Sequence, residues 1–328
     1  MTKIGTIGSG WASRVQTPLF REAGFDVVNI KGHDWRTLLD SDVDAVTITT
    51  PPSEHLEIAS AFLARGKHVI SEKPTALNAM EAQELVVAAE QRPELIAIID
   101  HELRFLPAWI AARERIRELG GVRYVEVRYS SPARGDRSRE WNWWSDADRG
   151  GGILGAVGSH FADAIRYLVG EIEEVQAMLV TMIDERSGKK VTADDFAEVN
   201  LKLAGGAHAV MTLNAVASGP DEQAMMTIHC EREAMRLIGS ELLVAKRGEP
   251  YALVAGEEMP KLPGNSMGGA FGSGTKELAR ALKRALEDGD RGALAPAATF
   301  HDGLVQQRVL DAARRSSANG GKWESIAT

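Results

Sequence analysis

Glu72-Lys73-Pro74 holds a lysine between an acid and a proline, with only Ser71 between it and the short strand His68-Val69-Ile70. A residue that precedes proline is restricted to extended backbone geometry, so Pro74 fixes how the Lys73 ammonium is presented. Such an ammonium can stabilise an oxygen that gains negative charge during a reaction, and Glu72 can hold it or change its pKa. Most loop lysines are simply solvated. The position at a strand end nevertheless predicts a functional role for Lys73.

A second turn, Thr49-Thr50-Pro51-Pro52, follows the short strand 46–48 in the same way. The segment between the two turns has the pattern of a helix over residues 53–65, which Gly66 ends. In an α/β sheet, ligands bind beyond the carboxyl ends of the strands, where both turns fall. We therefore expect a cofactor crevice that is lined from this region by Thr49, Thr50, Pro51, His55, Glu72 and Lys73.

The first strand, residues 3–7, runs into Gly8-Ser9-Gly10-Trp11-Ala12-Ser13 and then into an apolar and basic segment. Gly8 and Gly10 fit the first two glycines of the dinucleotide fingerprint, with Ser13 in place of the third. Gly8 allows the tight turn, and Gly10 lets the backbone approach a pyrophosphate at the amino end of a helix. A glycine pair after a strand is also a common turn, but this position favours cofactor binding by Gly8, Ser9, Gly10, Trp11 and Ala12.

The second strand, residues 25–30, ends in Lys31-Gly32-His33-Asp34. Asp34 can accept hydrogen bonds from the adenosine ribose hydroxyls of NAD, whereas Lys31 or His33 can pair with the 2′-phosphate of NADP. All four residues can equally be turn residues without a ligand. The choice between NAD and NADP stays open.

The length of the chain fits two domains, since 328 residues are enough for each domain to bury its own core. A net charge of −8 argues against nucleic acid and anionic membranes as partners. One cysteine, Cys230, excludes an intramolecular disulfide and a cysteine-based metal cluster. No apolar run has signal-peptide or membrane-span length, so we expect a cytoplasmic protein.

Strand patterns begin again at residues 122–127, so we place the domain boundary there: residues 1–120 bind the dinucleotide, and residues 121–328 bind substrate and form oligomers. Apolar and polar residues alternate through 175–182, 197–203, 208–214 and 225–229, which is typical of a sheet with one buried face. Glycine-rich residues 264–274 predict a loop. Residues 275–287 and 298–316 predict amphipathic helices that pack against the sheet.

Between these strands, residues 152–169 predict a helix behind three glycines. Its apolar residues form one stripe: Leu154, Val157, Phe161, Ile165 and Leu168. Helical spacing puts His160 and Asp163 on the opposite face, where His160 can face a cleft. An exposed or structural histidine is the commoner case. One imidazole and one carboxylate do not complete a zinc or iron site, so we expect no metal.

Two further clusters are candidates for the same cleft. His101 and Arg104 follow the apolar strand 95–99, His101 on the nicotinamide side and Arg104 toward substrate hydroxyls; Arg104 can instead bridge the two domains. Trp143 and Trp144 precede the glycines. Their indole faces can stack on the C–H faces of a sugar ring, or they can form a hydrophobic plug between the domains.

Residues 7–13, 44–52, 66–74 and 150–163 together resemble the Gfo/Idh/MocA family of NAD(P)-dependent sugar and polyol oxidoreductases. The most specific matches are Glu72-Lys73-Pro74 and the Gly150-Gly151-Gly152 segment with His160 and Asp163. The resemblance implies an α/β Rossmann domain followed by an α+β domain with a large, mostly antiparallel sheet. It also implies a catalytic histidine, His160, beside the reacting carbinol. Members often oligomerise through the sheet, so we expect a homodimer or homotetramer.

Two departures from the family pattern stand out. About twenty residues, roughly one αβ unit, are missing after the second strand, which opens the adenosine side and exposes a sheet edge. Many members also carry an aspartate four residues before the histidine, where this chain has Ala156.

The function that this resemblance implies is hydride transfer between a nicotinamide and a secondary hydroxyl or ketone of a carbohydrate-like substrate. Lys73 and His160 handle the proton, while NAD or NADP supplies the redox chemistry. Two alternatives remain: a glycosidase that uses the cofactor transiently, and a regulatory protein that binds the nucleotide without catalysis.

Overall fold

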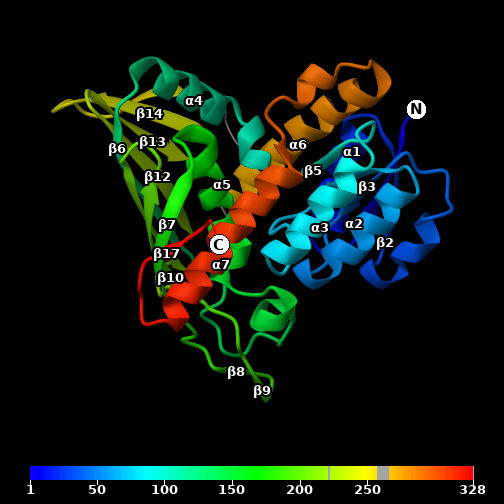
Figure 1. Cartoon of the computed structure of the whole chain (residues 1–328), viewed down its shortest axis with the longest axis horizontal. Coiled ribbons are helices and arrows are strands. Elements are labelled where there is room, and N and C mark those ends of the chain that lie inside the picture. Colours follow the sequence, from blue (N-terminus) through cyan, green and yellow to red (C-terminus); the bar gives the residue numbers. More distant parts are fainter. Residues whose placement is uncertain (221, 257–265, 328) are drawn as a thin grey trace. The chain divides into compact units, whose positions relative to one another are not determined.

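The computed structural model describes residues 1–220, 222–256 and 266–327, with only the backbone described for residues 266–268. Contacts within the chain divide it into two compact units (Figure 1). The first unit comprises Met1–Phe105 and Phe271–Gln307, and the second comprises Leu106–Ala270 and Arg308–Thr328.

The first unit contains a six-stranded sheet in the order β16-β5-β4-β3-β1-β2. Strands β1 to β5 are parallel, and β16 runs antiparallel to β5. These strands are β1 Lys3–Ile7, β2 Asp26–Ile30, β3 Ala45–Ile48, β4 His68–Ser71, β5 Ala97–Ile99 and β16 Ala298–Thr299. Parallel strands that are covered on both faces are the hallmark of a doubly wound sheet. The predicted Rossmann architecture is confirmed.

Two apolar clusters cover the two faces of this sheet. On one face, Phe62 and Leu85 belong to α2 (His55–Ala64) and α3 (Ala79–Glu90). On the other face, Phe20 and Leu282 belong to α1 (Thr17–Glu22) and α6 (Ser266–Glu287). Short helical turns complete the unit: η1 Ala12–Gln16, η2 Gly32–Leu38, η3 Pro52–Glu54, η4 Glu102–Phe105 and η8 Arg291–Leu294.

Strand β2 is an edge of the sheet, as the shortened sequence predicts. The chain leaves β2 through η2 and enters β3 on the far side of β1. Trp35 and Leu38 of η2 are buried, and the Trp35 ring packs on Phe62 at a centroid distance of 6.0 Å. The short connection therefore still covers one face of the sheet with apolar side chains.

The second unit contains a nine-stranded sheet in the order β15-β14-β13-β12-β6-β11-β10-β7-β17. Only the β6–β11 pair among these neighbours is parallel, which confirms a large, mostly antiparallel sheet. The strands are β6 Val122–Ser130, β7 Ile172–Val180, β10 Phe196–Leu203, β11 His208–Asn214, β12 Gln223–Cys230, β13 Glu233–Ile238, β14 Glu241–Lys246, β15 Ala252–Ala255 and β17 Glu324–Ser325. Buried and more exposed residues alternate along β6, β10 and β11, so one face of the sheet is buried.

The helices of the second unit lie between these strands in the sequence. They are α4 Pro107–Leu119, the turns η5 Trp143–Ser145 and η6 Ala147–Arg149, the π-helical η7 Leu154–Gly158, and α5 Ser159–Leu168. Helix α7, Phe300–Ala318, begins in the first unit and continues into the second at Arg308. A small hairpin, β8 Glu185–Arg186 and β9 Lys189–Lys190, completes the unit.

The compact units differ from the predicted division at residue 120. Helix α4 belongs to the second unit, and residues 271–307 return to the first. This return has a physical cause, because Leu278 and Leu282 of α6 pack into the core beside the parallel sheet and β16 pairs with β5. Composition carries no signal for such a long-range return.

The glycine-rich loop predicted over residues 264–274 is wrong from Ser266 onward, where α6 begins; residues 264 and 265 lie outside the described residues. Gly274 lies inside this helix. A Cβ there would lie 2.4 Å from the Glu102 carbonyl oxygen, so a close approach of two backbones requires glycine. Among the described residues, no helix has the length and apolar character that crossing a membrane requires.

Candidate active site

The glycine turn after β1 has the geometry of a nucleotide-binding turn. Gly8 has φ +141°, and a Cβ on it would lie 2.2 Å from Thr49 Oγ1, so only glycine fits. Ser9 and Gly10 are exposed, and a Cβ on Gly10 would meet nothing within 4 Å. The helical segment from Ala12 begins directly behind them. Exposed backbone at the start of a helix suits a pyrophosphate, so this turn fits the predicted dinucleotide.

Ser13 braces the same turn in the position of the third glycine. Its hydroxyl oxygen lies 3.1 Å from the Gly8 carbonyl oxygen and 2.9 Å from Asn29 Oδ1, and its one proton can be donated to either acceptor. The Asn29 amide in turn donates to the carbonyl oxygens of Thr6 and Gly8 at 3.0 and 3.2 Å. Asn29 was not among the predicted site residues, because its sequence position is like that of any polar residue in an edge strand.

His55 links the two turns that the sequence analysis placed at the crevice. Its Nε2 lies 2.9 Å from the Thr50 carbonyl oxygen, and its Nδ1 lies 3.1 Å from the Pro74 carbonyl oxygen. Burial lowers the pKa of His55, and a neutral imidazole donates only one hydrogen bond at a time. The ring is fully buried, so this geometry favours a role in holding the turns together over the predicted contact with the cofactor.

Three carboxyl groups gather around Lys73 at the carboxyl ends of β4 and β5. Gln16 joins two of them, because its amide nitrogen donates to Asp100 Oδ2 at 3.0 Å and to Glu72 Oε1 at 3.3 Å. Asp100 and Glu102 are buried, and the peptide bond from Lys73 to Pro74 is cis. We call Glu72, Asp100 and Glu102 the carboxyl cluster.

The carboxyl cluster holds protons more tightly than solvated acids do. Burial raises the pKa of Glu72 to about 8 and that of Asp100 to about 6, and it raises the pKa of Glu102 well above its usual value. Repulsion from Asp100 adds to the effect on Glu72 and Glu102, whereas the positive charge of Lys73 lowers the pKa of all three. At neutral pH the cluster therefore retains protons, and its remaining negative charge faces the Lys73 ammonium.

Gln16, Asp100 and Glu102 were not among the predicted site residues. Asp100 and Glu102 flank His101 at the end of the strand 95–99, and three consecutive polar residues at such a strand end were the available signal. Gln16 gave none. His101 is also buried, at the predicted place just beyond β5.

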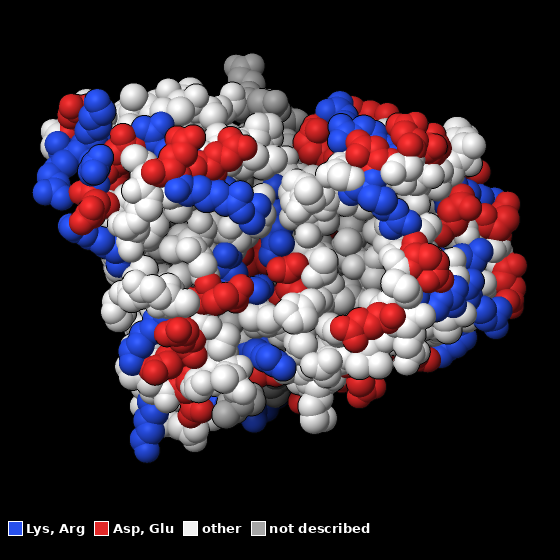
Figure 2. Space-filling model, turned by 45° about the horizontal axis from the view of Figure 1, so that its top comes forward, with Lys and Arg blue, Asp and Glu red and all other residues white. Residues whose placement is uncertain are grey.

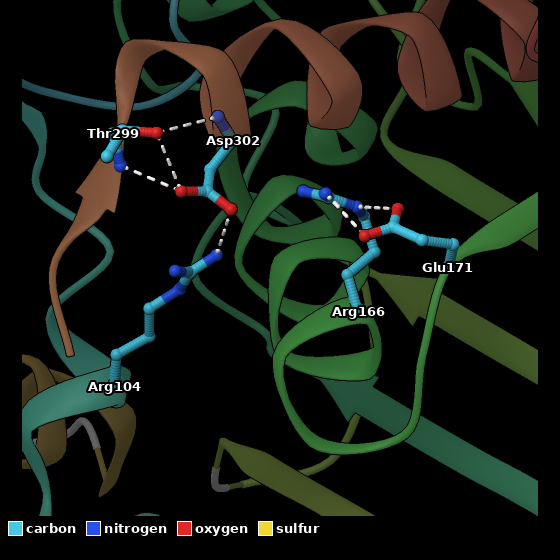
Figure 3. Close-up of polar contacts among 5 residues, drawn as sticks. All are labelled: Arg104, Arg166, Glu171, Thr299 and Asp302. Atoms are coloured by element: carbon cyan, nitrogen blue, oxygen red, sulfur yellow. Dashed lines mark hydrogen bonds and ion pairs between the residues drawn. The ribbon is translucent and has the colours of Figure 1, made fainter. Parts of the chain in front are cut away.

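Arg104 is fixed by the start of α7 (Figure 3). Thr299 and Asp302 form a capping box there: the Asp302 amide donates to Thr299 Oγ1, and the Asp302 carboxylate accepts from the Thr299 amide at 2.9 Å. Arg104 Nη2 lies 3.3 Å from the other carboxylate oxygen, Oδ1. All three residues belong to the first unit, so this ion pair binds η4 to α7 within that unit.

In the second unit, the glycines before η7 allow the tryptophan segment to pack closely. A Cβ on Gly151 would lie 2.5 Å from the Trp143 carbonyl oxygen and 2.6 Å from that of Trp144. The two indole rings lie 5.8 Å apart, and the Arg134 guanidinium stacks over Trp144 at 3.7 Å. Both tryptophans are partly exposed. The structure therefore brings Trp143 and Trp144 to the glycine segment that leads into α5.

His160 lies in the first turn of α5 and is buried, as are both the predicted apolar stripe and the opposite face with Asp163. Residues Leu154–Gly158 are π-helical, so helical arithmetic from Leu154 to His160 does not hold across them. Asp194, which the sequence analysis missed, fixes the start of this helical segment. Its carboxylate accepts from the Leu154 amide at 2.8 Å, and a Cβ on Gly152 would clash with it at 2.3 Å.

Among the described residues, no group of three or more His, Cys, Asp and Glu side chains could hold a metal ion.

Comparison with known proteins decides the family. A model described as "Oxidoreductase family, NAD-binding Rossmann fold" matches residues 11–99, and one described as "GFO/IDH/MocA C-terminal domain" matches residues 109–236. The chain belongs to the Gfo/Idh/MocA family. This Gfo/Idh/MocA protein is 30% identical to the glucose-fructose oxidoreductase domain-containing protein 2 of Bos taurus, over 98% of the chain and 93% of that relative.

Solved structures share the fold of this Gfo/Idh/MocA protein over its whole length. A levoglucosan dehydrogenase in complex with NADH superposes with a TM-score of 0.85 at 23% identity, over 99% of both chains. An inositol dehydrogenase homologue of Azotobacter vinelandii, complexed with NADH and myo-inositol, superposes with a TM-score of 0.80 at 20% identity, over 99% of this chain and 97% of that one. At these identities the likeness establishes the fold, and with it the Rossmann domain followed by a large sheet.

Proposed function

We propose that this protein transfers hydride between NAD(H) or NADP(H) and a secondary hydroxyl or ketone of a sugar, a polyol or a derivative. The observation that carries the proposal is Lys73 at the end of β4, surrounded by the carboxyl cluster. A structural lysine needs no such setting. Family membership supports the reaction class.

The glycine turn supports the binding of a dinucleotide, with Ser9, Gly10 and the residues that open the helical segment offering backbone amides to its pyrophosphate. When bound, the nicotinamide supplies the hydride acceptor or donor. At the adenosine side, Lys31, His33 and Asp34 are all exposed, and His33 Nε2 lies 3.5 Å from Asp34 Oδ2. Either cofactor remains compatible with this arrangement.

His160 is the proposed general base in the oxidation direction and the general acid in reduction. It takes the proton from the substrate hydroxyl through a ring nitrogen. Lys73 donates a hydrogen bond to the same oxygen or to the nicotinamide ribose, so that negative charge developing on oxygen is stabilised. Ala156 supplies no carboxylate beside His160, and Lys73 therefore handles a larger share of the proton transfer.

The carboxyl cluster orients Lys73 in this mechanism. Its charge attracts the ammonium, and the amide of Gln16 fixes two of the acids relative to each other. Because the cluster is protonated in part at neutral pH, it holds Lys73 without the cost of burying three full negative charges.

A carbohydrate-like substrate is supported by Trp143 and Trp144, which are partly exposed and whose backbone packs against Gly151 ahead of the His160 helix. Among the structures that share this fold, a second levoglucosan dehydrogenase structure is described in complex with NADH and levoglucosan, and the inositol dehydrogenase homologue is described with NADH and myo-inositol. For the assembly, we propose a homo-oligomer through the more exposed face of the nine-stranded sheet, which carries the stacked pair Tyr124 and His229.

The experiment has two stages. Calorimetric titration with NAD, NADP and their two reduced forms tests cofactor binding. A screen of sugars and polyols, followed by absorbance of the reduced nicotinamide, then tests turnover. Binding of a nucleotide together with net turnover of a sugar supports the proposal. If none of the four nucleotides binds, the proposal is refuted. Nucleotide binding without turnover of any substrate would favour the regulatory alternative.

A further inference from the structure

Three arginine side chains line one cavity in the second unit, and none of the described residues lining it is acidic. The cavity has a volume of about 480 Å³ and is formed by α4, the end of α5 and two glycine-containing turns, near Gly120 and Gly205. This local charge contrasts with the net charge of −8 of the whole chain. It also contrasts with the face drawn in Figure 2, where acidic and basic side chains lie interspersed.

Arg166 forms a fixed wall of the cavity. Its Nε and Nη2 donate to the two carboxylate oxygens of Glu171 at 2.8 and 2.9 Å (Figure 3). Such a two-point pair fixes the plane of the guanidinium and balances its charge. The side chain of Arg166 is only 5% exposed. Arg166 therefore shapes the cavity rather than adding net charge to it.

Arg113 and Arg117 supply the net charge. They lie four residues apart on α4, so their side chains are neighbours on one helix face. Neither forms an ion pair with any residue that the structure describes. The Arg113 guanidinium carbon lies 4.0 Å above the centre of the Tyr167 ring, which orients this group without neutralising it. Two positive charges thus face one cavity without a negative partner.

The chemistry of these charges selects the ligand. A phosphate monoester carries close to two negative charges at neutral pH, so one such group balances both arginines, whereas one carboxylate balances only one of them. Guanidinium groups match phosphate oxygens with paired hydrogen bonds. The cavity volume is in the range that small-molecule sites occupy, and therefore exceeds what a lone ion needs. We propose that this cavity binds a small phosphorylated organic molecule through Arg113 and Arg117.

Charge at helix ends is the competing explanation. Arg117 and Arg166 lie in the last turns of α4 and α5, where positive side chains stabilise the helix dipole. That role predicts a loss of stability when the arginines are replaced, with no effect on the binding of any phosphate. The proposed site instead predicts weaker phosphate binding when the arginines are replaced, with stability largely kept. This proposal does not depend on the proposed hydride transfer.

The test is calorimetric titration of the full chain at an ionic strength of about 0.15 M. Glucose 6-phosphate, inorganic phosphate, citrate and glucose serve as probes. We expect glucose 6-phosphate to bind more tightly than inorganic phosphate and citrate do. Glucose should not bind in the cavity, so any heat of glucose binding should be the same in the wild type and in the cavity variant. The double variant Arg113→Gln/Arg117→Gln should weaken the binding of glucose 6-phosphate at least about tenfold, because two charge-assisted contacts are lost.

The matched control is Arg128→Gln/Arg232→Gln, which removes the same charge at two exposed positions outside the cavity. It should leave the affinity within about twofold. The cavity variant leaves the active site unchanged, so glucose 6-phosphate bound at the active site would still bind to this variant. Loss of glucose 6-phosphate binding in the cavity variant therefore locates the ligand in the cavity. Arg117→Gln alone, at an exposed position, gives the same test if the double variant does not fold.

Four results would overturn the proposal. They are no binding of glucose 6-phosphate, equal weakening in the control variant, tighter binding of citrate or inorganic phosphate, and a loss of stability in the cavity variant with unchanged affinity.

Discussion

Gln16 donates a hydrogen bond from its side-chain amide to Asp100 over 3.0 Å, although 84 positions separate the two residues in the sequence. The same amide reaches Glu72. A helix that begins at the glycine turn is thereby connected to the acids that surround Lys73. Gln16, Glu72 and Asp100 thus form one hydrogen-bonded network that joins the helical segment behind the glycine turn to the lysine turn within the first unit.

This network makes the stability of the protein depend on pH. The folded-state pKa values of Glu72 and Asp100, about 8 and about 6, lie above those of the unfolded chain. Between roughly pH 4 and pH 8 the folded state therefore binds more protons than the unfolded state, and stability falls as pH rises. We expect the midpoint of urea unfolding to be higher at pH 5 than at pH 8.

Replacing Glu72 with Gln should flatten this dependence, since the variant keeps the shape of the side chain and removes its titration. A pKa difference of one corresponds to about 1.4 kcal/mol, so the change in slope is measurable. Glu114→Gln, at an exposed position on α4, is the control and should leave the slope unchanged. A wild-type midpoint that rises from pH 5 to pH 8 would contradict the prediction.

Gly8 and Gly10 should respond differently to the same substitution. Gly8→Ala introduces a Cβ at positive φ that lies 2.2 Å from Thr49 Oγ1, so we expect a destabilised protein. Gly10→Ala meets no atom within 4 Å and should leave the melting temperature unchanged, yet weaken nucleotide binding because the methyl group occupies the space above the turn. Thermal unfolding and calorimetric titration of both variants check this. Unchanged nucleotide affinity in Gly10→Ala would argue against the turn as the pyrophosphate site.

His160→Ala and Lys73→Met should each lower turnover on the order of a hundredfold, because each removes a group that acts on the reacting oxygen. We expect the nucleotide affinity of His160→Ala, and the far-ultraviolet circular dichroism spectra of both variants, to remain near those of the wild type. A variant His160→Ala with full activity toward the identified substrate would exclude the histidine as the proton carrier.

Arg104 offers a test of structure against recognition. Thr299→Ala removes the capping box of α7 and should cost about 1 kcal/mol of stability, with KM unchanged. Arg104→Met removes the ion pair with Asp302 and should also destabilise the protein. If Arg104 contacts substrate as well, KM rises in Arg104→Met alone. Steady-state kinetics and urea unfolding of both variants separate the two roles.

The sequence predicts the positions in this fold that local chemistry decides. Strand ends and their turns at Gly8, Pro51 and Pro74 follow from glycine and proline geometry, and the missing unit after β2 follows from the comparison with the family pattern. The order of the strands around β1 is then restricted by the parallel topology. The resemblance of the Glu72-Lys73-Pro74 and glycine segments to a family added what periodicity could not: the type of the second sheet.

Other features depend on long-range packing and escaped prediction. The contact of Gln16 with Asp100 joins segments that no local pattern relates. Gly274 lies in a helix and not in a loop, and its lack of a side chain lets the Glu102 backbone lie against that helix. The π-helical turn before His160 breaks the helical spacing on which the predicted opposite face relied.

The pairing of β16 with β5 also sets the order in which the protein can be completed during synthesis. Residues 298–299 and the helix α6 before them are translated long after the parallel strands that they cover. While the ribosome makes the second unit, the first lacks the part of its apolar cover that α6 supplies, and the edge of β5 that β16 pairs with is open. Its folding therefore finishes only after residue 299 has left the ribosome, so a fragment that ends near residue 120 should aggregate rather than fold as a separate domain.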